Sequence, residues 1–327
     1  MTAETLILLE QKFPKATKAE CRRFWDACRR NNNNNEVVTA GTKDATVLLV
    51  ETEKALEEYL EWRRRLGMDE DKGNDSQSIE SKNNNNNKDP TTTTNHHDAI
   101  LWKKSCHRCE QIMMMRKQQV SSNKASFTTK EKRKTKDKSA KTSIHVPQFV
   151  FSHNSNKHNN KTSTSGRSQL VDNQGNQILH VLPALMDIQN VTAEWYGRTL
   201  QFYLDGLLNR ESHDKVTVLL DVRPGEGWPN PMAVFMVNFI RKIAKMLQGR
   251  FPGRLEKLIV FPVPKPALGI FHAVRWVLST ELAEKIVLVS GSAERKSPLP
   301  KHELKTYISE DVLDFTETVR VAKFVPG

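Results

Sequence analysis

The chain has 327 residues, of which 37% are hydrophobic, and its 50 basic residues outnumber the 38 acidic ones, which gives a net charge of +12. This length suits about two domains, but the hydrophobic fraction is low for a chain that is globular throughout, so we expect ordered domains diluted by polar inserts. No apolar run reaches the roughly 18 residues that span a bilayer, and the N-terminus MTAETLILLEQK lacks the basic region of a signal peptide, which together favour a cytoplasmic protein.

Residues 1–67 are predicted to form a small all-α domain, because apolar residues recur there at spacings of three and four. An Asn-rich insert at residues 31–43 interrupts this pattern. Thr17 and Glu20 have the spacing of a capping box, which marks a helix start. The helices are expected over residues 4–30 and 44–66.

The middle of the chain has little capacity to form a core. Residues 68–98 contain runs of Asn and Thr and are expected to be a disordered insert, whereas residues 99–120 regain a helical pattern. A basic linker follows at 121–145, and its segment 124–141 carries eight basic and two acidic residues. Such a run is typical of a solvated segment. Attraction to a membrane surface and a nuclear or nucleic-acid signal are alternatives that charge alone does not separate.

Residues 146–327 alternate between strand and helix patterns, which predicts an α/β domain with a mainly parallel sheet. A polar stretch at 153–170 is expected to be a disordered insert within it. The run KVTVLLDV is continuously apolar, as parallel core strands are. The other expected strands are VPQFVFSH, a strand from Ile178, KLIVFPV and KIVLVSG; the expected helices cover residues 192–210, 231–247, 265–285 and 299–308.

One strand of this domain ends abruptly. The apolar run at 258–261 stops against Pro262, Pro264 and Pro266, and proline cannot continue a strand ladder. The next segment, ALGIFHAVRWVL, is apolar on most sides of a helix. Such a helix must be buried in a core or must meet lipid.

Motifs for catalysis are missing. The sequence has no GxSxG elbow, no phosphate-binding GxxxxGK[ST], no complete dinucleotide fingerprint and no HExxH. Asp221 ends a strand, where a catalytic carboxylate can lie, but no partner motif accompanies it and a turn-capping role is favoured. We therefore expect no catalytic residues, no enzyme activity and no cofactor, and an α/β hydrolase-like enzyme is the least favoured alternative.

The four cysteines do not define a metal site. Cys106 and Cys109 have zinc-knuckle spacing, but a closed zinc site needs a second pair. Cys21 and Cys28 suit two faces of a helix better than a metal clip. We expect unpaired thiols on helices, with zinc binding and a redox CxxC as the alternatives.

Several segments in order resemble one family. These are RRFWDACRR and KALEEYLEWRR in the first half, then GNQILHVLPALMDI, KVTVLLDVRPG, FPGRLEKLIVFPVP, LSTELAEKIVLVSG and LPKHELKTYISEDVL. Over residues 17–67 and 146–314 the chain resembles the CRAL-TRIO family of lipid-binding and lipid-transfer proteins, which includes phosphatidylinositol and tocopherol transfer proteins. The resemblance implies a helical N-terminal domain and an α/β domain whose flanking helices enclose a lipid cavity.

The resemblance also implies where a lipid would lie. The helix after the prolines would gate the cavity, and acyl chains would gain about 0.8 kcal/mol for each CH₂ buried. The expected lipid-binding residues are Val218, Leu220, Phe235, Phe239, Ile243, Ile259 and Phe261 in the walls, and Leu268, Phe271, Val274 and Leu278 in the gate.

The implied head-group site is incomplete. Lys285 matches a lysine that holds the inositol phosphate in phosphatidylinositol-transferring members, and it can meet a phosphate as a point charge. Gly253 and Leu282 replace the Glu and Thr of those members, so the resemblance does not name the lipid.

We therefore expect a monomeric carrier that binds a phospholipid-like or phosphoinositide-like lipid and touches membranes transiently. The alternative is a membrane-recruited lipid sensor tethered by the basic linker. Nucleic-acid binding is not expected, because the aromatic residues of stacking surfaces are missing from the basic run.

Overall fold

The structure is a computed structural model of the chain, and it describes residues 1–35, 45–66, 68, 90–125, 146–152, 170–225, 230–231, 233–265, 268–269 and 280–324. Most of the Asn-rich insert, of the insert at 68–98, of the basic linker and of the insert at 153–170 lies outside these residues. No helix in the described ranges is both long enough and apolar enough to cross a membrane.

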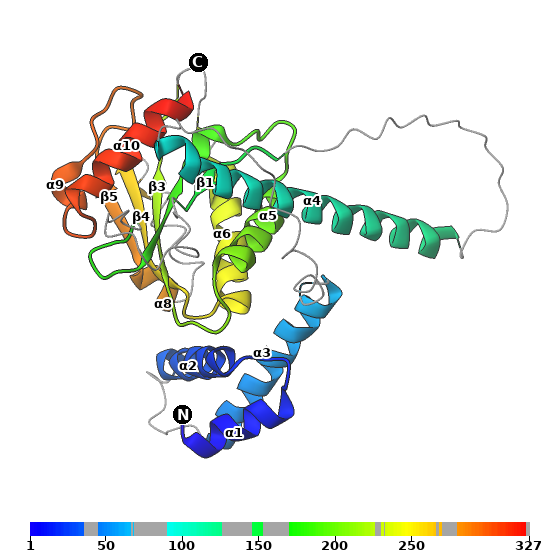
Figure 1. Cartoon of the computed structure of the whole chain (residues 1–327). Helices are drawn as coiled ribbons and strands as arrows, with labels where there is room; N and C mark the ends of the chain where they lie inside the picture. Colours follow the sequence, from blue (N-terminus) through cyan, green and yellow to red (C-terminus); the bar gives the residue numbers. More distant parts are fainter. Residues whose placement is uncertain are drawn as a thin grey trace.

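The N-terminal region is helical, as predicted, and consists of α1 (Ala3–Lys12), α2 (Lys18–Asn35) and α3 (Ala45–Arg65) (Figure 1). The helix expected over 4–30 is two helices. Phe13 ends α1 with φ −122°, because the residue before a proline is pushed out of the helical region. The α2 helix also continues through the Asn run to Asn35, five residues further than the capping and apolar pattern indicated.

The capping box at the start of α2 is confirmed. The Thr17 amide donates to Glu20 Oε2 at 2.8 Å, and the Glu20 amide donates to Thr17 Oγ1 at 3.2 Å. Each side chain therefore satisfies a backbone donor of the first helical turn.

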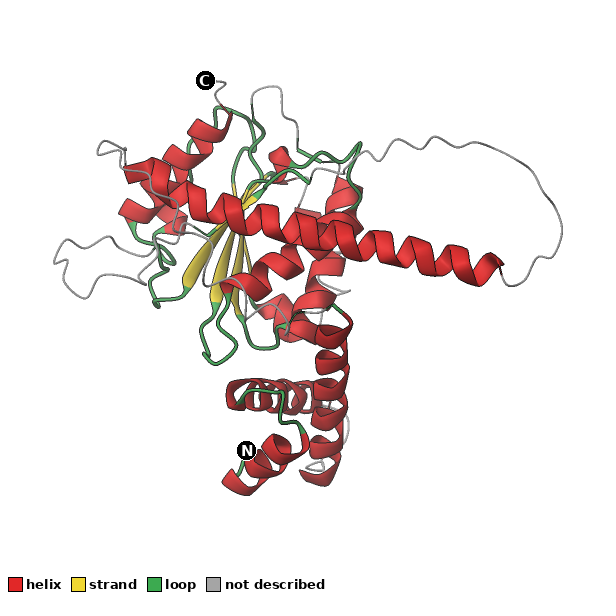
Figure 2. Cartoon of the chain, turned by 45° about the vertical axis from the view of Figure 1, so that its right-hand side comes forward, coloured by secondary structure: helices red, strands yellow, loops and turns green. Residues whose placement is uncertain are grey.

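The long helix α4 (Pro90–Ala125) starts earlier and ends later than the helix expected over 99–120. Proline is tolerated at a first helical position, where its missing N–H has no partner to lose. One end of α4 packs on the α/β domain: the Trp102 indole donates to the Val146 carbonyl at 2.9 Å and its ring lies edge-on to Phe149 and Tyr203. The other end extends beyond the body of the domain (Figures 1 and 2).

The predicted α/β class with a mainly parallel sheet is confirmed. The five strands are β1 (Val150–Phe151), β2 (Gln177–Val181), β3 (Val216–Asp221), β4 (Leu255–Val263) and β5 (Ile286–Ser290). They lie in the order β1-β2-β3-β4-β5, with β1 antiparallel to β2 and the other four parallel.

Helices cover both faces of the sheet. Because each parallel strand lies beside its predecessor, crossovers of one hand place their helices on the same face. The crossover helices are α5 (Ala193–Leu207), α6 (Ala233–Arg250) and the short α8 (Thr280–Glu284), with a 3₁₀ turn, η3, at Pro183–Leu185. The chain then passes to the other face, where α9 (Lys301–Leu304) and α10 (Glu310–Phe324) lie (Figure 1).

The last helices differ from the sequence prediction. The helix expected over 299–308 contains only the four-residue α9, and the longer α10 was missed. The buried face of α10 includes Thr316 and Arg320. Polar residues at those positions interrupt the apolar pattern from which a helix is predicted.

Charged side chains join the N-terminal helices to the α/β domain. The fully buried Glu20 accepts hydrogen bonds from Arg210 at 2.7 and 2.8 Å and from the Tyr59 hydroxyl at 2.6 Å. Arg63 on α3 pairs with Asp205 on α5. Burial alone would raise the pKa of Glu20, but the bonds from Arg210 and Tyr59 outweigh it and hold the pKa below its usual value.

Candidate functional site: an apolar cavity

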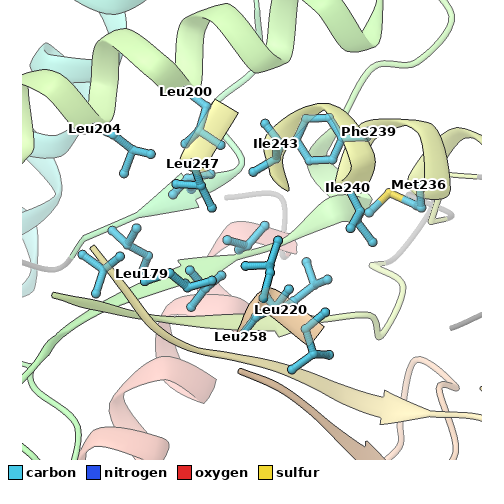
Figure 3. Close-up of a pocket in the computed structure, with 17 residues that line it drawn as sticks. Leu179, Leu200, Leu204, Leu220, Met236, Phe239, Ile240, Ile243, Leu247 and Leu258 are labelled. Atoms are coloured by element: carbon cyan, nitrogen blue, oxygen red, sulfur yellow. The ribbon is translucent and has the colours of Figure 1, made fainter. Parts of the chain in front are cut away.

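An apolar cavity of about 90 Å³ lies between the parallel sheet and the helices α5 and α6. Figure 3 shows its side chains converging from the sheet on one side and from the two helices on the other. The lining residues are Val150, Leu179, Val181, Leu200, Leu204, Val216, Val218, Leu220, Met236, Phe239, Ile240, Ile243, Leu247, Leu255, Leu258, Leu282 and Ile286. All of them are aliphatic or aromatic apart from the thioether of Met236.

The alternation of strand side chains decides which sheet residues reach the cavity. Val218 and Leu220, both expected in the wall, line it. Successive side chains of a strand point to opposite faces, so Leu219 between them faces away and packs in the core beneath α9 and α10.

The expectation for β4 is wrong by one residue. Ile259 pairs with Leu219, and Leu258 pairs with Val218. Leu258 therefore lines the cavity, while Ile259 and Phe261 lie on the opposite face in the core beneath α9 and α10. The run LIVF is apolar at every position, so the sequence contains no polar residue from which the outward face could be recognised.

Helix α6 forms part of the cavity wall that faces the sheet. Phe239 and Ile243 line the cavity as expected, together with Met236, Ile240 and Leu247 at helical spacing. Phe235 does not belong to the lining; its ring stacks beside that of Phe239, with centroids 6.5 Å apart and planes inclined by 9°.

Residues of α5 complete the wall and were missed from the sequence. Leu200 and Leu204 lie one turn apart on its buried face. Their amphipathic spacing was visible, but nothing in the sequence showed that this face meets the cavity and not solid core. Among the expected gate residues, Leu268 packs partly buried against the main core, whereas Phe271, Val274 and Leu278 lie outside the described residues.

A second pocket of about 40 Å³, with a mixed polar and apolar lining, adjoins the cavity, and Lys285 lies in it. The two spaces share Leu247, Leu255 and Leu282 as lining residues. Lys285 Nζ lies 2.9 Å from Glu281 Oε1. The predicted head-group lysine is thus close to the apolar cavity, and an acidic side chain already pairs with it.

Asp221, at the opposite end of the strands from Lys285, is buried and hydrogen-bonded to Arg223. Its carboxylate accepts from the Arg223 amide at 3.0 Å and from the Arg223 guanidinium at 2.6 Å, and Arg223 also pairs with Glu317 on α10. Burial, then the neighbouring Arg223 and Arg320, lower the pKa of the nearby His180 to about 3. This arrangement gives Asp221 a capping and ion-pairing role at the end of β3.

The cysteines do not contribute to the cavity lining. All four are free, and burial raises the pKa of Cys106 to about 12 and that of Cys109 to about 11. Thiols in such surroundings are poor nucleophiles at neutral pH. In the part of the chain that the structure describes, no three His, Cys, Asp or Glu residues are grouped to hold a metal ion.

Comparison with known proteins identifies a domain family. Residues 165–316 match the family model described as the CRAL/TRIO domain, and these residues include most of the cavity wall. No curated protein matches the chain. Among solved structures, one titled "Crystal structure of Sfh5" is 15% identical, with a TM-score of 0.29; the match covers 35% of this chain and 42% of that chain.

Proposed function

We propose that this chain, whose residues 165–316 match the CRAL/TRIO domain, holds a lipid in the cavity beneath α5 and α6 and carries it between membranes. The observation that supports this most directly is the lining of the cavity, whose described side chains are all apolar. Burying hydrocarbon there is favourable by about 0.8 kcal/mol per CH₂. The process needs no covalent chemistry.

The size of the cavity adds a condition. Its volume of about 90 Å³ is smaller than the engineered cavity of about 150 Å³ that binds benzene in another protein. A complete acyl chain therefore requires α6 or α5 to move away from the sheet as the lipid enters. The α6 side chains that face the sheet in this wall are apolar, so α6 can move away from the sheet without breaking hydrogen bonds there, whereas α5 is also held by the pair of Asp205 with Arg63.

The direct test is to identify lipid that co-purifies with the full-length protein by mass spectrometry. We expect one lipid class near stoichiometric amounts. In the variant Ile240→Phe/Ile243→Phe, two added rings fill the cavity, and bound lipid should fall severalfold. Val321→Phe adds a ring at an exposed position on α10 and should leave lipid unchanged. No bound lipid, together with no uptake from vesicles, would contradict lipid carriage.

The exposed face of α4 favours contact between the protein and a membrane. One face of α4 packs on α5, and its opposite face exposes Lys103, Lys104, His107, Met114 and Met115. Lysines attract anionic lipid head groups at up to about 1 kcal/mol per charge, and exposed methionines can enter the interface.

Vesicle flotation tests this contact. Vesicles containing phosphatidylserine should bind the protein, and binding should fall as salt rises. Lys103→Glu/Lys104→Glu should weaken binding by roughly fivefold or more, while Lys54→Glu, an exposed lysine on α3, should have little effect. Binding that persists unchanged in high salt would argue against an electrostatic contact. Vesicle binding without lipid exchange would favour a sensor over a carrier.

A further inference from the structure

The loop between β5 and α9 contains the one serine or threonine of the chain that is directly followed by proline. This residue is Ser297, in the run RKSPLPK, which has two basic residues before the serine and Lys301 after it. The neighbouring Arg295, Lys296 and Pro298 are exposed. A proline after the acceptor and a pattern of flanking charge are features by which protein kinases select a serine. The run is therefore a candidate substrate of a proline-directed kinase.

The loop is suited to the local opening that a kinase requires. Residues 291–300 form neither helix nor strand, and Leu299 packs only partly buried against the core beneath α9 and α10. Around the serine, two arginines hold the backbone: Arg223 donates to the Ser297 carbonyl at 3.1 Å, and Arg320 donates to the Arg295 carbonyl at 3.3 Å. Segments with few buried apolar contacts open at a low cost in free energy.

The arginines that hold this loop also hold α10. Arg223 is fully buried and pairs with Asp221 at 2.6 Å and with Glu317 on α10 at 2.5 Å. Arg320 lies 3.5 Å from each of these two carboxylates. Two positive and two negative charges thus balance in the cluster. The side chain of Asp221 is 1% exposed and that of Glu317 is 32% exposed, so Glu317 is the partner that a new anion at the surface would replace.

We propose that Ser297 is a phosphorylation site, and that its phosphate replaces Glu317 as a partner of Arg223 and thereby loosens the second half of α10. In the transfer, Ser297 Oγ attacks the γ-phosphorus of ATP held by the kinase, its proton passes to the catalytic base of the kinase, and ADP leaves. Phosphoserine carries a charge of about −1.5 to −2 and three acceptor oxygens, which an arginine binds in bidentate geometry. Arg223 already holds the carbonyl of this same residue, which brings the phosphate within its reach.

The charges around the serine favour this exchange of partners. Arg295 and Lys296 add two positive charges to the balanced cluster and Glu294 adds one negative charge, so the phosphate enters surroundings that are positive overall. Glu317 then lies beside an anion of higher charge, and like charges repel. Because its side chain is partly exposed, Glu317 has a path into water.

The experiment treats the full-length protein with ATP and a purified cyclin-dependent kinase, a proline-directed enzyme, and locates phosphate by mass spectrometry. We expect phosphate on Ser297. Pro298→Ala removes the directing residue and should abolish it, whereas Ser292→Ala, an exposed serine of the same loop, should leave it unchanged. Backbone hydrogen exchange of the phosphorylated protein should then rise severalfold in the second half of α10, because loosened segments lose protection.

Two variants test the exchange of partners itself. Glu317→Gln removes the charge that holds α10, so it should raise hydrogen exchange there without phosphate, and phosphorylation should add little further. Asp311→Asn removes an exposed carboxylate from the first turn of α10 and should leave the full response to phosphate.

Each outcome bears on the inference without reference to lipid binding. Absence of phosphate from Ser297 after treatment with the kinase would overturn the site. Phosphate on Ser297 with unchanged or lower exchange in α10, or with an equal rise in Glu317→Gln, would overturn the replacement of Glu317 at Arg223.

Discussion

At the scale of single residues, Glu20 shows how a buried carboxylate joins two parts of the chain. It is fully buried and accepts hydrogen bonds from Arg210 on one side and Tyr59 on the other. Removing one partner of a buried ion pair leaves the other charge uncompensated, which typically costs about 3–5 kcal/mol. Glu20→Gln should therefore lower the free energy of unfolding by an amount in this range at pH 7.

The pH dependence of that loss is a second consequence. The pKa of Glu20 is held below its unfolded value, so its contribution to stability is complete above the unfolded pKa of about 4.3 and is lost as pH falls through the folded pKa. In urea titrations, the difference between wild type and Glu20→Gln should shrink below about pH 4. Glu57→Gln, at an exposed position, is the control. A difference that stays constant down to pH 3 would show that the ion pair does not account for the effect.

At the scale of elements, the sequence identified most of the sheet and of the crossover helices but not every face. The alternation of side chains divides a strand into two faces, but the register with the neighbouring strand decides which of the two faces the cavity. For β3, the residues expected in the cavity wall, Val218 and Leu220, do line it. For β4, the residues that line the cavity depend on the register with β3, in which Ile259 pairs with Leu219. In a strand that is apolar at every position, register is set by tertiary pairing and leaves no trace in local composition.

The missed helix α10 has a related explanation. Its buried face carries Arg320, whose guanidinium donates to the carbonyls of Pro224 and Arg295. That residue is buried because the neighbouring loops supply acceptors, and no local pattern contains this information. The cavity is predictable only in part for the same reason: Leu200 and Leu204 are readily assigned to a buried face, but the space beneath them results from how α5 and α6 rest on the sheet.

The end of α10 offers a test of element packing. Gly225 lies directly under the ring of Phe324, so a Cβ atom at residue 225 would collide with it. Gly225→Ala should lower stability by about 1–3 kcal/mol through overpacking. Phe324→Ala should also be destabilising, but the double variant should cost less than the sum, because the added methyl then has room. Strict additivity in a double-mutant cycle measured by chemical denaturation would refute this contact.

At the scale of the whole molecule, the residues that match the family model are fewer than the residues that fold together around the cavity. The match covers residues 165–316, yet α4 lies before it and still takes part in the same hydrophobic core through Trp102 and Cys109. Asp98 on α4 accepts from the Ser152 amide and hydroxyl, each at 2.5 Å, and from the Tyr203 hydroxyl at 2.9 Å. We therefore expect the cooperatively folded unit that encloses the cavity to begin within α4.

This boundary predicts that Trp102 is as important for stability as a residue inside the matched region. Trp102 is buried between Phe149 and Tyr203, and truncating a buried tryptophan typically costs about 3–5 kcal/mol. Trp102→Ala should lower the urea concentration at which half of the α/β domain is unfolded. The fluorescence of the remaining tryptophans monitors this unfolding. Met114→Ala, at an exposed position on the same helix, should leave that midpoint unchanged. If Trp102→Ala loosened only α4 while the domain kept its midpoint, α4 would be an accessory helix, and the unit that encloses the cavity would start at β1.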